Sequence, residues 1–191
     1  MLRPAALLVL GCVLFGGAWT LIAEQPAPAD ARKAARKLQA EGNFKDAFEQ
    51  FEKLALDPTN TTVDVADDIR RATQCLSQLQ RLHDVDAFLE KVVEKRRDSW
   101  RVLSIVAVQY GSIDHQGYLI AGAFHRGYSQ QGGQFVSSVD RDYVRSLQLF
   151  EAARAMLSDE PDAASVGGFF RRYAATISQM RQGESWRLQV L

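Results

Sequence analysis

Apolar residues recur at spacings of three and four along the first part of the chain, and this helical period constrains the fold most strongly. Two such stretches meet at Gly42-Asn43. Their apolar positions are Ala31, Ala34, Ala35 and Leu38, then Phe44, Ala47, Phe48, Phe51, Leu54 and Ala55. Asp57-Pro58 ends the second stretch, because a proline ring disfavours helical backbone in the residue before it. The pattern predicts two amphipathic helices joined by a glycine turn, the first one capped by Asp30.

The order of these residues resembles one tetratricopeptide repeat. In that motif small residues let two helices pack closely, and aromatic residues fill the gap to the next hairpin. A generic helical hairpin is the alternative, since Leu54 stands where the family has a small residue and Pro58 comes one residue early. A second pair of stripes follows, formed by Val65, Ile69, Ala72, Leu76 and Leu79, then Val85, Phe88, Leu89, Val92 and Val93. We expect residues 30–99 to form two tetratricopeptide-like hairpins.

The connection between these two hairpins contains Asn60-Thr61-Thr62, which is formally a glycosylation sequon. Threonines that cap the following helix are the simpler interpretation. On that helix, Cys75 is the one cysteine outside the leader region described below, and we interpret it as a buried apolar residue rather than a reactive thiol.

Residues 100–191 predict further helices around one glycine-rich segment. The segment, residues 111–138, holds six glycines, two histidines and four aromatic residues. It is too apolar for a solvated linker and too rich in glycine for a regular helix, so we expect a structured loop with a short helix at residues 118–124. Helices are expected at residues 100–110, from Ser137 or Ser138 to Glu160-Pro161, and at 163–180. The predicted fold is all-α, a short right-handed array of hairpins with no clear strand.

The first 29 residues differ from the rest and predict an exported chain. Arg3 supplies a positive charge, and residues 5–23 then run without any charge. This is the pattern of a secretory signal peptide, and an uncleaved run of that length could anchor the chain in a membrane. A Pro/Ala linker completes residues 1–29. Cys12 loosely resembles a lipoprotein box, but more apolar residues follow it. We expect a periplasmic or cell-envelope location.

Charge excludes one class of partner. The chain has 23 Lys and Arg against 23 Asp and Glu, a formal net charge of zero, whereas binding to phosphate backbones needs a surplus of basic residues. The basic runs at residues 95–97 and at Arg171-Arg172 are too short for a nucleic-acid footprint. A protein partner, of unknown identity, is the expectation that remains.

No residue set in the sequence carries catalytic, cofactor-binding or metal-binding chemistry, so we expect no enzyme and no cofactor. His115 and His125 are ten residues apart, a spacing that matches no familiar ligand motif, and we interpret them as capping or packing residues. Residues 127–133 are rich in glycine but lack the Gly-Lys-Ser/Thr ending of a phosphate-binding loop. Asp142 and Arg145, three residues apart on one helix, are expected to pair on a solvated face.

Three segments together carry a second resemblance. They are Gly117-Tyr118-Leu119-Ile120-Ala121-Gly122-Ala123-Phe124-His125-Arg126-Gly127, Gly132-Gly133-Gln134-Phe135-Val136, and Asp140-Arg141-Asp142-Tyr143-Val144-Arg145-Ser146-Leu147-Gln148-Leu149. They are similar to the N-terminal helical region of large exported alpha-2-macroglobulin-like proteins of planctomycete bacteria. That family presents a bait segment to a protease and traps it, often through a reactive Cys-Gln thioester, but no such motif is present in this chain.

The resemblance implies the front end of a protease-trapping protein, cut short at Leu191. We therefore expect a non-enzymatic exported scaffold that binds another protein. One alternative is an inactive fragment whose inhibitor function lies in a missing C-terminal region. The other is a small metal-dependent hydrolase built on His115 and His125.

Overall fold

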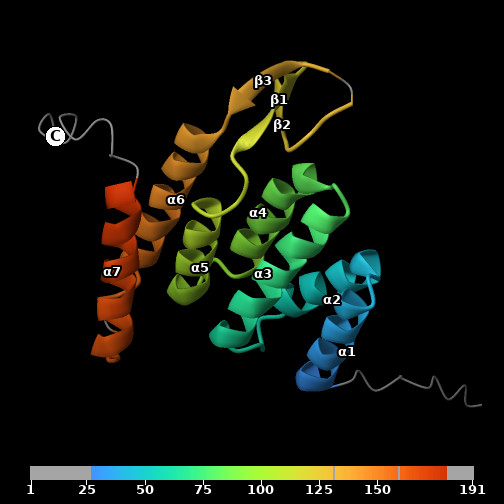
Figure 1. Cartoon of the computed structure of the whole chain (residues 1–191). Helices are drawn as coiled ribbons and strands as arrows, with labels where there is room; N and C mark the ends of the chain where they lie inside the picture. The colour runs from blue at the N-terminus through green and yellow to red at the C-terminus, as the bar shows by residue number, and fades with distance from the viewer. Residues whose placement is uncertain (1–26, 131, 159, 180–191) are drawn as a thin grey trace, which may run out of the picture.

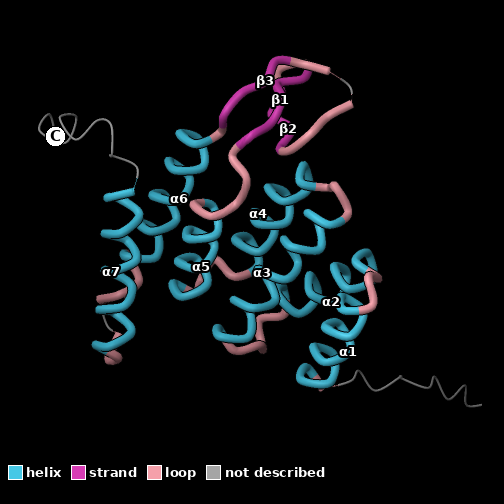
Figure 2. The backbone as a smooth tube through the Cα atoms, in the orientation of Figure 1, coloured by secondary structure: helices cyan, strands magenta, loops and turns pink. Residues whose placement is uncertain are grey.

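The computed structural model describes residues 27–130, 132–158 and 160–179. Most of these residues are helical, and the helices stand side by side from one end of the molecule to the other (Figure 1). The helices are α1 (Pro28–Ala40), α2 (Phe44–Leu56), α3 (Thr62–Gln78), α4 (Val85–Lys95), α5 (Trp100–Tyr110), α6 (Val139–Arg154) and α7 (Ala163–Gln179). A small three-stranded sheet lies above one end of the helices (Figure 2).

The ends of the first helices follow from local sequence. Gly42 adopts a φ of +83° in the turn between α1 and α2, a conformation that costs glycine little. Asp57 is the C-cap of α2, as the following proline predicts. Thr61 caps α3 by accepting a hydrogen bond from the amide of Asp64, which confirms the interpretation of the capping threonines.

The expected N-cap of the first helix is wrong. Helix α1 begins at Pro28, and Asp30 lies in its first turn. Proline suits this first position because its missing N–H would have no helical partner there. The last residues of the predicted Pro/Ala linker are therefore helical. The leader itself, residues 1–26, lies outside the described residues, and none of the described helices is long and apolar enough to cross a membrane.

The helices form two layers. Helix α2 packs between α1 and α3 and also contacts α4, while α3 contacts α5, and α5 contacts α7. Ion pairs join α1 to α3 and α4 to α6. Helices α1, α3, α5 and α7 thus make up one layer, and α2, α4 and α6 make up the other. A paired-helix pattern is therefore present through most of the described chain.

The core between the layers uses most of the residues that the helical period predicts, with Ala34 on α1 as an exposed exception. Ala35, Ala47 and Ala72 are fully buried where helices approach closely, and Cys75 is buried as expected. Aromatic rings fill the wider gaps in edge-to-face contacts, which suit the ring quadrupole. The pairs are Phe48 with Phe88 at 5.7 Å, Trp100 with Phe169 at 5.9 Å and Phe150 with Phe169 at 5.6 Å between ring centroids.

The glycine-rich segment is an antiparallel sheet, which corrects both the predicted loop and the predicted short helix. Its strands are β1 (Gln116–Ile120), β2 (Ala123–Arg126) and β3 (Gln134–Ser137), in the order β2-β1-β3. Ala121 and Gly122 both have positive φ, which is the geometry of a two-residue hairpin turn. Tyr118 lies opposite His125 on one side and Phe135 on the other. The fold is mostly helical rather than all-α.

Gly117 shows why the segment needs its glycines. A Cβ at this strand position would meet the carbonyl oxygen of His125 and lie 2.5 Å from the ring of Phe124. The strands can therefore approach only where this side chain is absent. A short apolar run such as residues 118–124 fits a helix or a strand equally well, and cross-strand pairing decides between them.

One further boundary differs from expectation. Helix α6 begins after Ser138, as predicted, but ends at Arg154 rather than at Glu160-Pro161. Helix α7 begins at Ala163, and Phe169 on it is buried, while Phe170 is 46% exposed. The early end of α6 leaves Glu160 free to bond Trp100 and Arg101 on α5.

Candidate functional site

A groove crosses the layer formed by the odd-numbered helices. It has a volume of about 730 Å³ and is lined by α3, α5, α7 and the residues just before α7. That volume falls within the range of about 300–1,000 Å³ typical of ligand sites. The sequence predicts paired helices but not which helix of each pair forms a binding surface. The structure assigns this groove to α3, α5 and α7 of the odd-numbered layer, without α1.

The groove is lined by apolar side chains, of which Val63 and Val108 lie outside the core. Val63 on α3 is 83% exposed, and Val108 on α5 is 40% exposed. Ile105, also on α5, is half-buried. The side chain of Trp100 also lines the groove, and its Nε1 donates a hydrogen bond to Glu160 at 2.8 Å. The groove therefore offers an apolar surface to a ligand.

Two arginines of the groove have carboxylate partners. Arg70 binds Asp67, which also accepts hydrogen bonds from Arg71 and Arg36. Burial raises the pKa of Asp67, but these hydrogen bonds outweigh burial and lower it to about 2. Arg101 bonds Glu160 at 2.9 Å and lies 3.7 Å from Asp162. These guanidinium groups are already neutralised within the chain.

Arg171 and Arg172 on α7 differ from them. Both are exposed, and no described residue forms an ion pair with either one. Both side chains turn toward Gly168, one turn earlier. A Cβ built on Gly168 would lie 3.6 Å from Nη1 of Arg172 and 3.9 Å from Nη2 of Arg171. Burial, and then the positive charge of Arg171, lowers the pKa of Arg172, although a guanidinium stays charged at neutral pH.

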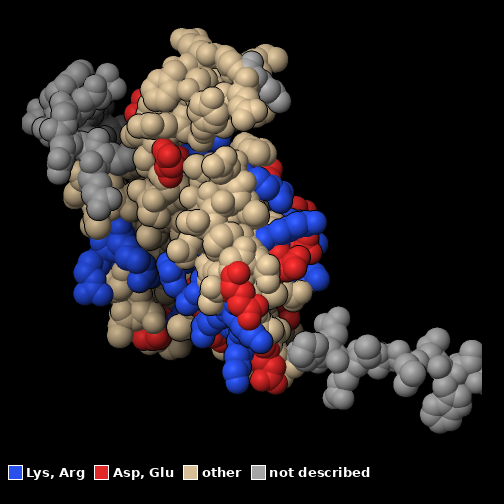
Figure 3. All heavy atoms as spheres, turned by 45° about the vertical axis from the view of Figure 1, so that its right-hand side comes forward, with Lys and Arg blue, Asp and Glu red and all other residues tan. Residues whose placement is uncertain are grey.

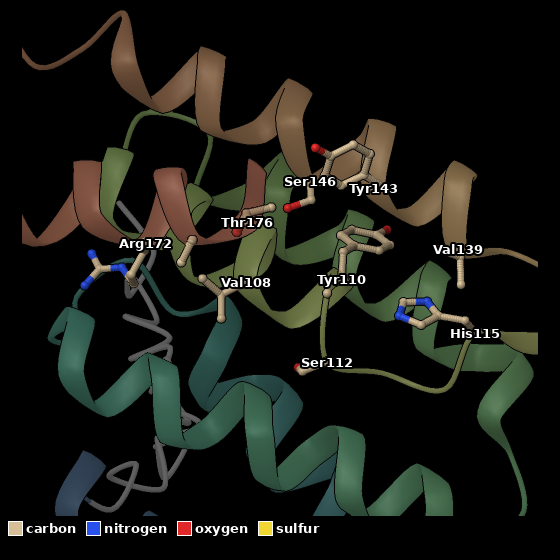
Figure 4. A pocket seen from close by; sticks show the side chains of 11 residues that line it. Val108, Tyr110, Ser112, His115, Val139, Tyr143, Ser146, Arg172 and Thr176 are labelled. Atoms are coloured by element: carbon tan, nitrogen blue, oxygen red, sulfur yellow. The ribbon is translucent and has the colours of Figure 1, made fainter. Parts of the chain in front are cut away.

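A second pocket adjoins the groove and shares Val108 and Arg172 with it (Figure 4). Its volume is about 410 Å³. Arg172 lies at one end of this pocket and His115 at the other, with the rings of Tyr110 and Tyr143 between them. The two hollows therefore share part of their lining on α5 and α7.

The predicted pair between Asp142 and Arg145 is wrong, and so is its solvated setting. Asp142 is fully buried and receives both terminal nitrogens of Arg126, at the end of β2, at 2.8 Å. Arg145 instead bonds Glu90 on α4 at 2.6 Å. The cause is tertiary, because the sheet and α4 supply partners that are stronger than the neighbour on the same helix.

Asp142 is the centre of an ionic cluster that attaches the sheet to the helices. Ser138 donates to it at 2.6 Å, Nδ1 of His115 lies 2.8 Å away, and Arg141 donates from Nη2 at 2.8 Å. Burial raises the pKa of Asp142, but the hydrogen bonds, first that from Arg126, hold it well below its usual range. Such a fully bonded carboxylate is suited to a structural role.

Asp86 extends the cluster to α4. It binds Arg126 at 2.7 Å and Arg141 at 2.9 Å. Glu90, one turn further along, accepts from the hydroxyl of Tyr110 at 2.7 Å, and burial, together with that bond, raises the pKa of Tyr110 above its usual range. The cluster is built from three elements that are far apart in sequence.

The two histidines of the glycine-rich segment face different neighbours. His115 points to Asp142, while His125 stands opposite Tyr118 in the sheet. Among residues 27–130, 132–158 and 160–179, no group of three or more His, Cys, Asp and Glu side chains could hold a metal ion. His115 is held by a carboxylate, in keeping with the packing role that the sequence indicates.

Sequence reasoning missed the groove residues Val63, Ile105 and Val108. The sequence does contain a signal for these groove residues, because each of them lies outside the apolar stripe from which its helix is predicted. On α5 the stripe is Trp100, Leu103, Val106, Ala107 and Tyr110, so an apolar residue at 105 or 108 lies on a different face. A second apolar face on a helix is typical of a surface that contacts something besides its own core.

Comparisons with protein-family models, with curated proteins and with solved structures found no match to this chain.

Proposed function

We propose that this chain is a non-enzymatic scaffold that binds a segment of another protein in the groove between α3, α5 and α7. The observation that carries the proposal is the pairing of exposed valines with arginines that lack a partner in the described chain, both inside one groove. A helix face that contacts only water gains nothing from exposed valines grouped with arginines in one hollow. Binding surfaces combine an apolar centre with a few polar groups that set orientation.

The proposal extends to the architecture. Small residues at the helix contacts, aromatic rings between pairs and two layers of alternating helices support tetratricopeptide-like hairpins stacked as a short right-handed array. Solenoids of this type present an extended concave surface to their partners. In this proposal the sheet is an insertion between α5 and α6 that lies over one end of the helices.

The proposal also includes export. Residues 1–29 act as a signal peptide or anchor that directs the scaffold to the cell envelope, and the scaffold itself belongs to a macroglobulin-like protease-trapping system, with a partner of unknown identity. The charge-free run after Arg3 supports the export part, and the resemblance stated for residues 117–149 motivates the macroglobulin-like part.

Site-specific photocrosslinking tests the binding function. Short random peptides displayed on phage are selected on the purified full-length chain and then bound to variants with a photocrosslinking amino acid at position 63 or 144. Val63 lines the groove, whereas Val144 on α6 is 53% exposed and lies outside it. We expect crosslinks from position 63 and none from position 144. Failure to select any peptide, or equal crosslinking from both positions, would overturn the proposal.

A further inference from the structure

The charge distribution of the groove distinguishes one wall from the other. Arg70 and Arg101, on α3 and α5, already bond carboxylates of this chain. Arg171 and Arg172, on α7, have no ion-pair partner among the described residues. The α7 wall therefore carries the positive charge that the groove has available for a ligand.

The guanidinium groups of Arg171 and Arg172 are gathered at one point. Each has a nitrogen within 4 Å of the position that a Cβ on Gly168 would take. Neighbouring like charges repel, and a counter-ion between them relieves that repulsion. The planar guanidinium fork matches a carboxylate with two parallel hydrogen bonds, so the pair suits an acidic group.

The rest of the groove indicates which acidic ligand fits. Val63, Ile105 and Val108 face the same hollow and would lie against apolar side chains. A polyphosphate has no such groups, and a nucleic acid would place many phosphates against only two arginines that have no ion pair among the described residues. The chain as a whole has no surplus positive charge either. A protein segment combines a carboxylate with neighbouring apolar side chains.

We infer that the groove recognises an acidic, apolar segment of a partner protein, with an Asp or Glu carboxylate of that segment between Arg171 and Arg172 and an apolar side chain against Val63 and Val108. The inference rests on the proposed function and specifies its ligand. Figure 3 agrees with a local rather than a general charge, since Lys and Arg lie among Asp and Glu over the helices, and the region of the strands is largely uncharged in that view.

Two peptide libraries test the inference separately from the proposed function. One contains all residue types, and the other omits Asp and Glu. We expect the complete library to yield groove-binding peptides that carry an acidic residue next to apolar ones, and the acid-free library to yield none that crosslink from position 63. If acid-free peptides bind the groove equally well, the inference fails while the binding function stands. If neither library yields a groove binder, both fail.

Charge reversal supplies the second measurement. The double variant Arg171→Glu, Arg172→Glu should weaken binding of a selected acidic peptide about tenfold to a hundredfold, since a lost charge pair costs about 2 kcal/mol or more. Arg97→Glu is the matched control, because Arg97 is exposed, lies outside the groove and has no ion pair among the described residues. It should leave the affinity unchanged.

Conservative variants keep the test informative if charge reversal disturbs folding. Arg171→Lys with Arg172→Lys retains the charge but loses the fork, so it should weaken binding less than the glutamate pair does. Affinity measured by fluorescence anisotropy should also fall with added salt. Equal affinity for wild type, lysine and glutamate variants would overturn the inference. So would self-association of the chain that these variants abolish, because the occupant would then be a second copy.

Discussion

Each half of the molecule contains a buried arginine–aspartate pair, and the two pairs differ in how well the carboxylate is compensated. Asp68 on α3 faces Arg32 on α1 at 3.0 Å, and Asp142 on α6 faces Arg126 on β2 at 2.8 Å. Both carboxylates are fully buried. Burial nevertheless raises the pKa of Asp68, whereas the pKa of Asp142 is lowered.

The difference lies in the neighbours. Asp68 is bonded by Arg32, while the negative charges of Asp67 and Asp64 oppose its ionisation. Asp142 is bonded by Arg126, Ser138, His115 and Arg141, and these bonds outweigh the cost of burial. Burial alone therefore does not decide the charge state of a carboxylate in this protein. The number of donors around it does.

The two halves also use their ion pairs differently. In the first half, α1, α2 and α3 share an apolar core, and the Arg32–Asp68 pair adds to contacts that already hold the helices together. In the second half, the sheet contacts the helical body chiefly where β2 lies beside the short turn Leu82–Asp84. The ionic cluster around Asp142 therefore attaches the sheet to the helices, whereas apolar packing holds the helices to one another.

Removing each arginine in turn tests this comparison most strongly. Arg126→Met leaves Asp142 and Asp86 without their main partner, and we expect a loss of about 3–5 kcal/mol in the free energy of unfolding. Arg32→Met should cost less, about 1–2 kcal/mol, because Asp68 takes up a proton more readily. Urea unfolding followed by circular dichroism measures both. Equal losses would contradict the distinction between the two pairs.

A pair of glycine variants tests the packing of the sheet. Gly117→Ala should destabilise the protein by about 1–3 kcal/mol, because its Cβ would overlap β2. Gly167→Ala on α7 is the control. A Cβ there has no neighbour within 4 Å, and alanine favours a helix over glycine, so we expect a gain of about 0.5–1 kcal/mol. The two melting temperatures should move in opposite directions, and a neutral Gly117→Ala would show that the strands tolerate a wider spacing.

The pH dependence of two asparagine variants gives the smallest and most specific effect. Asp142 has a lowered folded-state pKa, so its contribution to stability is present above the unfolded value of about 4 and is lost as the pH falls below it. The cost of Asp142→Asn should therefore shrink in acid. Asp68 has a raised folded-state pKa, so its contribution is full below about pH 4 and is lost as the pH rises through the folded pKa.

The cost of Asp68→Asn should consequently shrink as the pH rises, opposite in sign to that of Asp142→Asn. Each unit of pKa shift corresponds to about 1.4 kcal/mol. Urea unfolding of the wild type and both variants, repeated from acid to neutral pH, gives the two slopes. Parallel slopes would mean that the donors around Asp142 do not compensate its burial.

The sequence predicts the helical part of this fold well, because local signals act there. The period of Ala47, Phe48 and Phe51, the proline after Asp57 and the cap at Thr61 each specify structure within one turn of the chain. The burial of Cys75 follows from the same period. The groove residues were partly signalled too, since Val63 and Val108 lie off the stripes of their helices.

The remaining features depend on partners that are distant in sequence. Residues 118–124 form strands because Tyr118 pairs with His125 and Phe135, and nothing local excludes a helix there. Asp142 does not pair with its expected neighbour Arg145, because Arg126 on β2 bonds Asp142 and Glu90 on α4 bonds Arg145. Arg171 and Arg172 are neighbours in the sequence and exposed on α7, but only the packing of α7 beside α5 places them in a groove.

The sequence by itself thus determined the paired helices, since hydrophobic period, caps and proline act over a few residues. Tertiary structure alone decided the sheet, the charge state of Asp142 and the position of the groove. Those features depend on hydrogen bonds and electrostatic interactions between separate elements, whose strength depends on distance and burial rather than on order along the chain.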